Sequence, residues 1–139
     1  MFTHIMAPVD LHHVDTLDRA LKVTADAAKH YGAKVTFVSA TNNEPSDVAH
    51  SPEEFVAKLS EFAKAQAEKG GFDAEAHAMV LHDSRADLDN ALLDAVKELD
   101  ADLVIMASHD PNFADHFWSS NGGAVARHSH ASVMLVRGR

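Results

Sequence analysis

The chain has 139 residues, of which 46% are hydrophobic and 24% charged, as in a folded globular protein. Its 21 acidic and 12 basic residues give a formal net charge of −9, which argues against nucleic acid or a membrane surface as a partner. The absence of cysteine excludes disulfide and thiolate chemistry, and no apolar run approaches the roughly 18 residues of a membrane span. The first ten residues do not resemble a signal peptide, so a cytoplasmic location is expected.

The first half of the chain alternates twice between a short apolar run and a helical pattern. An apolar run at 4–9 predicts a buried strand, and apolar residues three and four apart predict a helix over 17–31. A β-branched run at 34–40 predicts a second strand, and the helical spacing returns over 55–69 after a polar loop. Glycines are placed to end these helices: Gly32 ends the first, and the pair Gly70–Gly71 ends the second.

The second half continues the same alternation. Residues 75–81 form a weaker third strand pattern, followed by helical spacing over 88–99. The apolar run at 102–107 does not alternate, which indicates a central strand buried on both faces. A helix around 120–128 and a last strand at 132–136 complete the pattern.

Helices between successive strands predict one doubly wound α/β domain that spans residues 1–139. We expect a five-stranded, mainly parallel sheet in the order 3-2-1-4-5, sandwiched by four helices. In such a sheet a ligand binds outside the carboxyl ends of the strands, where the strand order reverses. The loops 10–13 and 108–112 would then face each other and form the site.

The fourth helix begins in a run of small residues, 119–123. Small residues leave the first N–H groups of a helix open, and the helix dipole favours an anion there. Equally, Ser120 can act as an ordinary helix cap, with the glycines allowing close packing. The residues alone leave both interpretations open.

Three stretches resemble the universal stress protein family: IMAPVD (5–10), MASHDP (106–111) and SNGGAVARHSHASVMLVR (120–137). The resemblance covers the whole chain and is closest to a subgroup whose loop reads A-S-H-x-P. It implies a stress-response or signalling module that binds ATP or another adenine nucleotide, with or without Mg²⁺, and lacks fast catalysis. It also implies a homodimer formed through the C-terminal strand.

The resemblance further implies where the nucleotide binds. In the family the adenine and ribose lie near the end of the first strand and the phosphates lie near the start of the last helix. Carried over to this chain, the nucleotide-binding residues are Pro8, Val9, Asp10, Ala40, Ala107, Ser108, His109, Asp110, Ser119, Ser120 and Asn121.

This chain departs from the family pattern at three glycines of the phosphate loop. Ala107, Asp110 and Ser119 stand in their places. A carboxylate about 4–6 Å from a phosphate costs roughly 3–4 kcal/mol at an effective dielectric constant near 20. A Mg²⁺ ion between Asp110 and phosphate would reverse that sign. The alternative is a member of the same family that binds no nucleotide and acts through an unidentified protein partner.

Histidines are numerous, and three lie on the two converging loops: His12, His13 and His109. With Asp10 and Asp110 they resemble a transition-metal ligand set, but solvated surface histidines are the simpler interpretation, so no metal is expected. The sequence lacks a G-x-x-x-x-G-K-(S/T) loop and a G-x-S-x-G motif. We therefore expect no catalytic residue and at most slow ATP hydrolysis.

Overall fold

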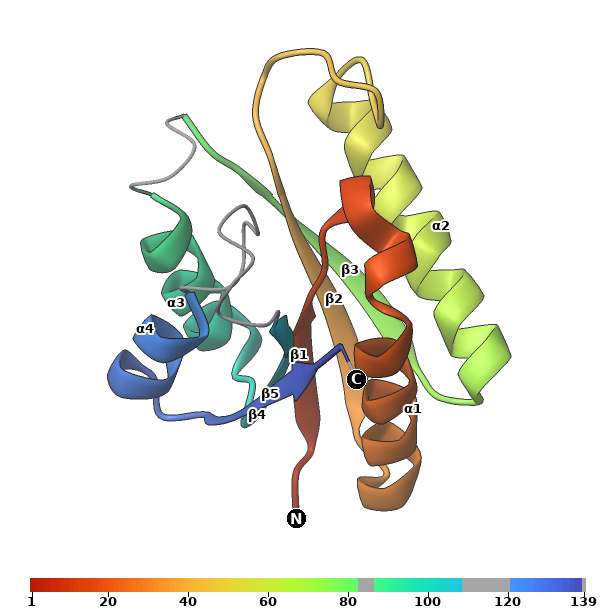
Figure 1. Ribbon diagram of the computed structural model, residues 1–139, viewed down its shortest axis with the longest axis vertical. Coiled ribbons are helices and arrows are strands. Elements are labelled where there is room, and N and C mark those ends of the chain that lie inside the picture. Colours follow the sequence, from red (N-terminus) through yellow and green to blue (C-terminus); the bar gives the residue numbers. More distant parts are fainter. Residues whose placement is uncertain (83–86, 109–120, 139) are drawn as a thin grey trace.

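A computed structural model describes residues 1–82, 87–108 and 121–138 (Figure 1). The elements are β1 (His4–Pro8), the 3-10 helix η1 (Leu11–Thr16), α1 (Asp18–Tyr31), β2 (Lys34–Thr41), α2 (Pro52–Gly70), β3 (Ala74–Val80), α3 (Leu88–Leu99), β4 (Leu103–Ser108), α4 (Asn121–His128) and β5 (Ser132–Arg137).

The five strands form one sheet in the order β3-β2-β1-β4-β5, and every pairing in it is parallel. This confirms the predicted fold class and strand order. All five residues of the central strand β1 are buried, as expected for a strand covered on both faces. β4 is likewise almost entirely buried, in agreement with its run of apolar residues without alternation.

The helices form a layer on each face of the sheet: α1 and α2 cover one face, and α3 and α4 cover the other (Figure 1). Alternate residues along β1 pack against the two helix layers, because successive side chains of a strand point to opposite faces of the sheet. Ile5, Ala7 and Val9 belong to the cluster beneath α1 and α2. Met6 belongs to the cluster beneath α3 and α4. The molecule therefore has two hydrophobic cores separated by the sheet.

Glycines end the first two helices, as predicted. Gly32 and Gly71 have φ of 65° and 72°, a conformation in which glycine avoids the steric cost of a Cβ. Their N–H groups donate to the carbonyls of Ala28 and Ala67. The predicted end of the second helix at the pair Gly70–Gly71 is confirmed: Gly70 is the last residue of α2, and Gly71 caps it.

α2 begins with a variant of the capping box, in which Glu54 bonds the N–H of His50 and not that of the N-cap residue Ser51. Ser51 Oγ accepts a hydrogen bond from the N–H of Glu54 at 3.1 Å. In return, Glu54 Oε2 accepts one from the N–H of His50 at 3.1 Å. These two bonds satisfy N–H groups that have no partner inside the helix, and they define where the polar loop after β2 ends.

Residues 10–13, expected to form a plain loop, are largely part of η1 instead. The Asp10 side chain caps this short helix by accepting a hydrogen bond from the N–H of His12. An aspartate side chain that accepts a hydrogen bond from the N–H two residues later forms a common local turn. Such a turn competes with an extended conformation of the loop. The segment after β1 is therefore folded back on the Asp10 carboxylate.

Asp102, just before β4, links the starts of β1 and β4 at the amino end of the sheet. Its carboxylate accepts hydrogen bonds from the N–H and Oγ1 of Thr3 and from the N–H of His4, with lengths from 2.9 to 3.2 Å. Partial burial favours the neutral carboxyl, but the hydrogen bonds from His4 and Thr3 outweigh it and lower the pKa of Asp102. The contact holds the starts of β1 and β4 together.

In the described ranges, no helix is both long enough and apolar enough to cross a membrane.

Candidate functional site

β1 and β4 are neighbouring parallel strands at the point where the strand order reverses, so their carboxyl ends belong to the same edge of the sheet. Predicted site residues occupy both ends. Pro8 is the last residue of β1, with Val9 and Asp10 directly after it, and Ala107 and Ser108 end β4. The predicted adjacency of β1 and β4 is confirmed, whereas the predicted facing of the loops 10–13 and 108–112 stays a prediction, because residues 109–112 lie outside the described residues.

Asp10 is held at this edge by two adjacent histidines. Its Oδ1 accepts from the N–H of His12 at 2.9 Å, and its Oδ2 lies 2.9 Å from Nδ1 of His13. The hydrogen bond and negative charge of Asp10 raise the pKa of His13. Asp10 is thus an oriented carboxylate, with most of its side chain shielded from solvent.

His12 connects the same turn to the loop after β2. Its Nδ1 lies 3.0 Å from Oδ1 of Asp47. Asp47 was not anticipated as a neighbour of the site, because a polar loop residue carries no pattern that predicts its contacts. Within the described ranges, no group of three or more His, Asp or Glu side chains is arranged to hold a metal ion.

The end of β2 contributes a third strand to this edge. The N–H of Val9 donates to the carbonyl of Val38 at 2.8 Å, and Ser39 Oγ donates to the carbonyl of Val9 at 2.7 Å. Ala40 is half-buried and packs on the cluster beneath α3 and α4, whereas Val9 and Ala107 pack on the cluster beneath α1 and α2. The predicted residues therefore divide between the two faces of the sheet.

The end of β4 is bonded to a residue that the sequence analysis did not assign to the site. Arg137 lies opposite Ser108 in the register of β4 and β5, and its Nη1 donates to Ser108 Oγ at 3.0 Å. Ser108 itself is only 6% exposed. The sole sequence signal was a basic residue at the end of a strand, which without the register does not indicate its partner.

Four predicted nucleotide-binding residues lie outside the described residues: His109, Asp110, Ser119 and Ser120. Asn121, the first described residue after this gap, lies in α4, as predicted. The contacts predicted for these loop residues remain predictions.

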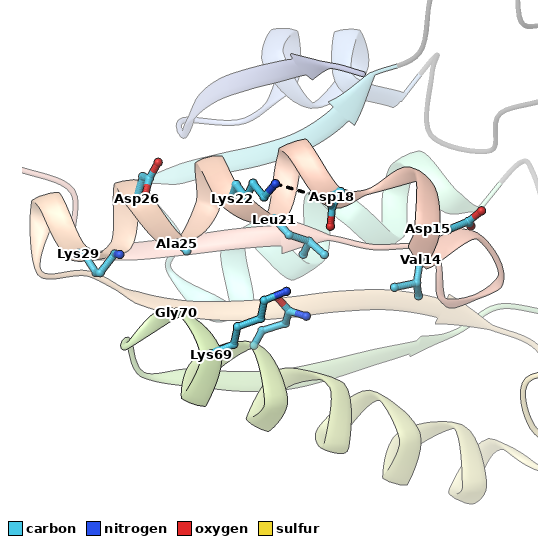
Figure 2. Close-up of a pocket in the computed structure, with 11 residues that line it drawn as sticks. Val14, Asp15, Asp18, Leu21, Lys22, Ala25, Asp26, Lys29, Lys69 and Gly70 are labelled. Atoms are coloured by element: carbon cyan, nitrogen blue, oxygen red, sulfur yellow. Dashed lines mark ion pairs between the residues drawn. The ribbon is translucent and has the colours of Figure 1, made fainter. Parts of the chain in front are cut away.

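A shallow groove of about 510 Å³ lies elsewhere, between α1 and the second half of α2 (Figure 2). Leu21 and Lys69 point into it from the two helices, and Asp18 and Lys22 form an ion pair of 3.5 Å along its rim. The residues that line it come from η1, α1 and α2, and none is a predicted nucleotide-binding residue. The groove is therefore a different surface from the edge described above.

The whole length of the chain matches one family of known proteins. The profile of the universal stress protein family matches residues 1–137. The chain belongs to this family. Universal stress protein G of Salmonella typhimurium is 24% identical over 146 residues, covering 99% of this chain and 100% of that protein.

Solved structures of other universal stress proteins share the fold. A universal stress protein in complex with cAMP is 21% identical with a TM-score of 0.71, and the match covers 99% of both chains. A universal stress protein family protein from Arabidopsis thaliana with AMP bound is 16% identical with a TM-score of 0.64. That match covers 97% of this chain and 90% of the other. Some structural relatives of this universal stress protein thus bind adenine nucleotides.

Proposed function

We propose that this chain is a cytoplasmic universal stress protein whose single domain, residues 1–139, binds ATP or a related adenine nucleotide. The A-S-H-x-P loop, residues 107–111, assigns it to a subgroup of the family. By binding this nucleotide the protein acts in stress response or signalling, without fast catalysis. The adenosine part of the nucleotide lies near Pro8–Asp10 and Ala40, and its phosphates lie between the end of β4 and the start of α4.

One observation carries this proposal: the Asp10 carboxylate is oriented just after β1, at the edge of the sheet that holds the carboxyl ends of the neighbouring strands β1 and β4. Parallel α/β sheets bind ligands at this kind of edge. An oriented carboxylate is a suitable acceptor for ribose hydroxyl groups, since hydrogen bonds to charged groups are stronger than neutral ones. The relatives solved with cAMP and AMP support adenine as the base.

The amino-acid sequence of the phosphate loop is the main reason to consider a different function. Ala107, Asp110 and Ser119 replace the family's three glycines, and Asp110 adds a negative charge where phosphates are expected. We propose that Mg²⁺ bound with the nucleotide would offset this charge, and that Asp110 would be among the residues that hold it. If the loop instead excludes nucleotides, the protein acts by binding a protein partner.

Calorimetric titration with ATP, ADP and AMP, each with and without Mg²⁺, tests the proposal. We expect ATP to bind more tightly with Mg²⁺ than without it. The variant Asp10→Asn is expected to bind all three nucleotides about 10- to 100-fold more weakly, because a charged hydrogen-bond acceptor is worth roughly 1.5–3 kcal/mol.

Asp94→Asn is the matched control, because it removes the same charge from an exposed position on α3 and should leave binding unchanged. No heat from wild-type protein at millimolar nucleotide would refute nucleotide binding and favour the protein-interaction alternative. Unchanged binding by Asp10→Asn would refute the role of this carboxylate alone.

We also propose that the protein is a homodimer formed through β5. Among the described residues β5 pairs with β4 alone, so one of its edges is open. Two large apolar side chains on this strand, Met134 and Leu135, are each 43% exposed. Open apolar edge strands tend to pair with another chain, which would cover both features at once.

Light scattering in solution tests the dimer. Wild-type protein is expected to have the mass of two chains of 15.0 kDa each, and Met134→Glu the mass of one, because a carboxylate would be buried in the interface. Val80→Glu is the control: Val80 is similarly exposed, at 42%, but lies on the opposite edge strand, β3. A single-chain mass for wild-type protein at micromolar concentration would refute the dimer.

A further inference from the structure

Arg137 lies at the same edge as the proposed phosphate site, on the strand beside β4. The register pairs Ala107 with Val136 and Ser108 with Arg137, so β4 and β5 end at the same level. Arg137 Nη1 donates to the hydroxyl of Ser108 at 3.0 Å. A cationic side chain is thereby fixed beside the last residue of β4, from which the phosphate loop leaves the sheet.

The side chain of Arg137 lies on the face of the sheet that carries α4. Residues two apart on a strand point to the same face, so Arg137 shares a face with Leu135. Leu135 packs directly against the first turn of α4: a Cβ placed on Gly122 would collide with its Cδ2. Arg137 therefore lies two residues after a side chain that touches the first described turn of α4, the end of a helix at which the dipole favours negative charge.

We propose that Arg137 contacts the phosphate groups of the bound nucleotide and makes binding stronger as the number of phosphates rises. This inference rests on the proposed nucleotide-binding function. A guanidinium has five N–H donors in a planar fork, so it can bond to Ser108 and to other acceptors at once. The ligand class is accordingly a linear adenosine di- or triphosphate, in preference to a ligand with a single phosphate.

This role also accounts for how an anion site can persist without the family's glycines. Glycines in a phosphate loop let backbone N–H groups approach the ligand closely. Ala107 carries a Cβ at the first of these positions. A side-chain donor reaches a phosphate without close approach of the backbone, so Arg137 would supply hydrogen-bond donors from β5.

Titration of wild-type and Arg137→Gln protein with adenosine, AMP, ADP and ATP tests the inference. We expect the loss of affinity in Arg137→Gln to grow along that series, from none for adenosine to about 10- to 100-fold for ATP. Arg137→Lys retains the charge but loses the planar fork, so its loss for ATP should be smaller. It also provides a test if the glutamine variant does not fold.

Lys34→Gln is the matched control, because it removes one positive charge from the start of β2, at the amino end of the sheet. An equal graded loss in Lys34→Gln would assign the effect to net charge and overturn the role of Arg137. A loss in Arg137→Gln that is the same for adenosine and ATP, or no loss, would also overturn it. If wild-type protein binds no adenine compound, the proposed function fails, and this inference fails with it.

Discussion

Replacing Phe37 by alanine is expected to lower the free energy of unfolding by about 3–5 kcal/mol. Phe37 lies in the middle of β2 and is 1% exposed. Its ring meets Phe62 of α2 edge-on with centroids 5.3 Å apart, and a tilted contact at 6.3 Å joins it to Phe72. The truncation removes buried apolar surface and leaves a cavity that a parallel sheet cannot close by shifting one strand.

Urea unfolding followed by circular dichroism measures this change as a shift of the midpoint at constant slope. Val56→Ala is the control, since Val56 is 45% exposed on α2 and its truncation should change stability by less than about 0.5 kcal/mol. A loss below about 1 kcal/mol for Phe37→Ala would mean that this aromatic cluster does not contribute to the core as described.

Replacing Asp102 by alanine is expected to cost about 2–3 kcal/mol at neutral pH, because it removes the acceptor for Thr3 and for the N–H of His4. His4 is buried, so its N–H would lose its partner away from water. The side chain of His4 remains held by its own hydrogen bonds, at 2.7 Å to the carbonyl of Leu99 and 2.7 Å to Thr36 Oγ1. The damage should therefore stay at the starts of β1 and β4.

The effect of Asp102 should depend on pH with a defined sign. Because the folded protein lowers the pKa of Asp102, the ionised carboxylate stabilises the fold above the unfolded pKa of about 3.9. This contribution is lost as the pH falls through the lower pKa of the folded state. The difference in unfolding free energy between wild type and Asp102→Ala should shrink below about pH 4.

Unfolding curves of both proteins at a series of pH values measure this difference. Asp94→Ala, on the exposed face of α3, serves as the control and should show no comparable pH dependence. A difference between wild type and Asp102→Ala that is constant across the acidic range would show that the ionised state of Asp102 does not matter.

The fold was predictable because each strand and helix can be identified from the residues within it. Each strand and helix has its own hydrophobic period, and helices between all successive strands leave a parallel sheet as the simplest arrangement. Gly32 and the glycine pair at residues 70–71 determine helix ends within one residue. η1 was missed because residues 11–16 carry no helical hydrophobic pattern. The hydrogen bond that the Asp10 carboxylate accepts from the N–H of His12 defines this short helix instead.

The candidate site was predictable only in part, because its contacts join residues far apart in the sequence. The resemblance to a family indicated Asp10 and Ser108, but neither the pairing of Asp10 with His13 nor the contact of Ser108 with Arg137 has a sequence signal. The second contact spans 29 residues and depends on the register of β4 and β5. A one-residue shift of that register would turn Arg137 to the opposite face.

The parallel pairing of every strand has a consequence for how the chain folds during synthesis. Among the five described strands no two form a hairpin, so each pairing must first close a long loop, which slows folding. β1, the central strand, is made first, and its bond to Asp102 spans 98 residues. Until β4 leaves the ribosome, one side of β1 has no partner strand and can pair with another nascent chain. The centre of the native sheet is thus the segment with the longest exposure to aggregation.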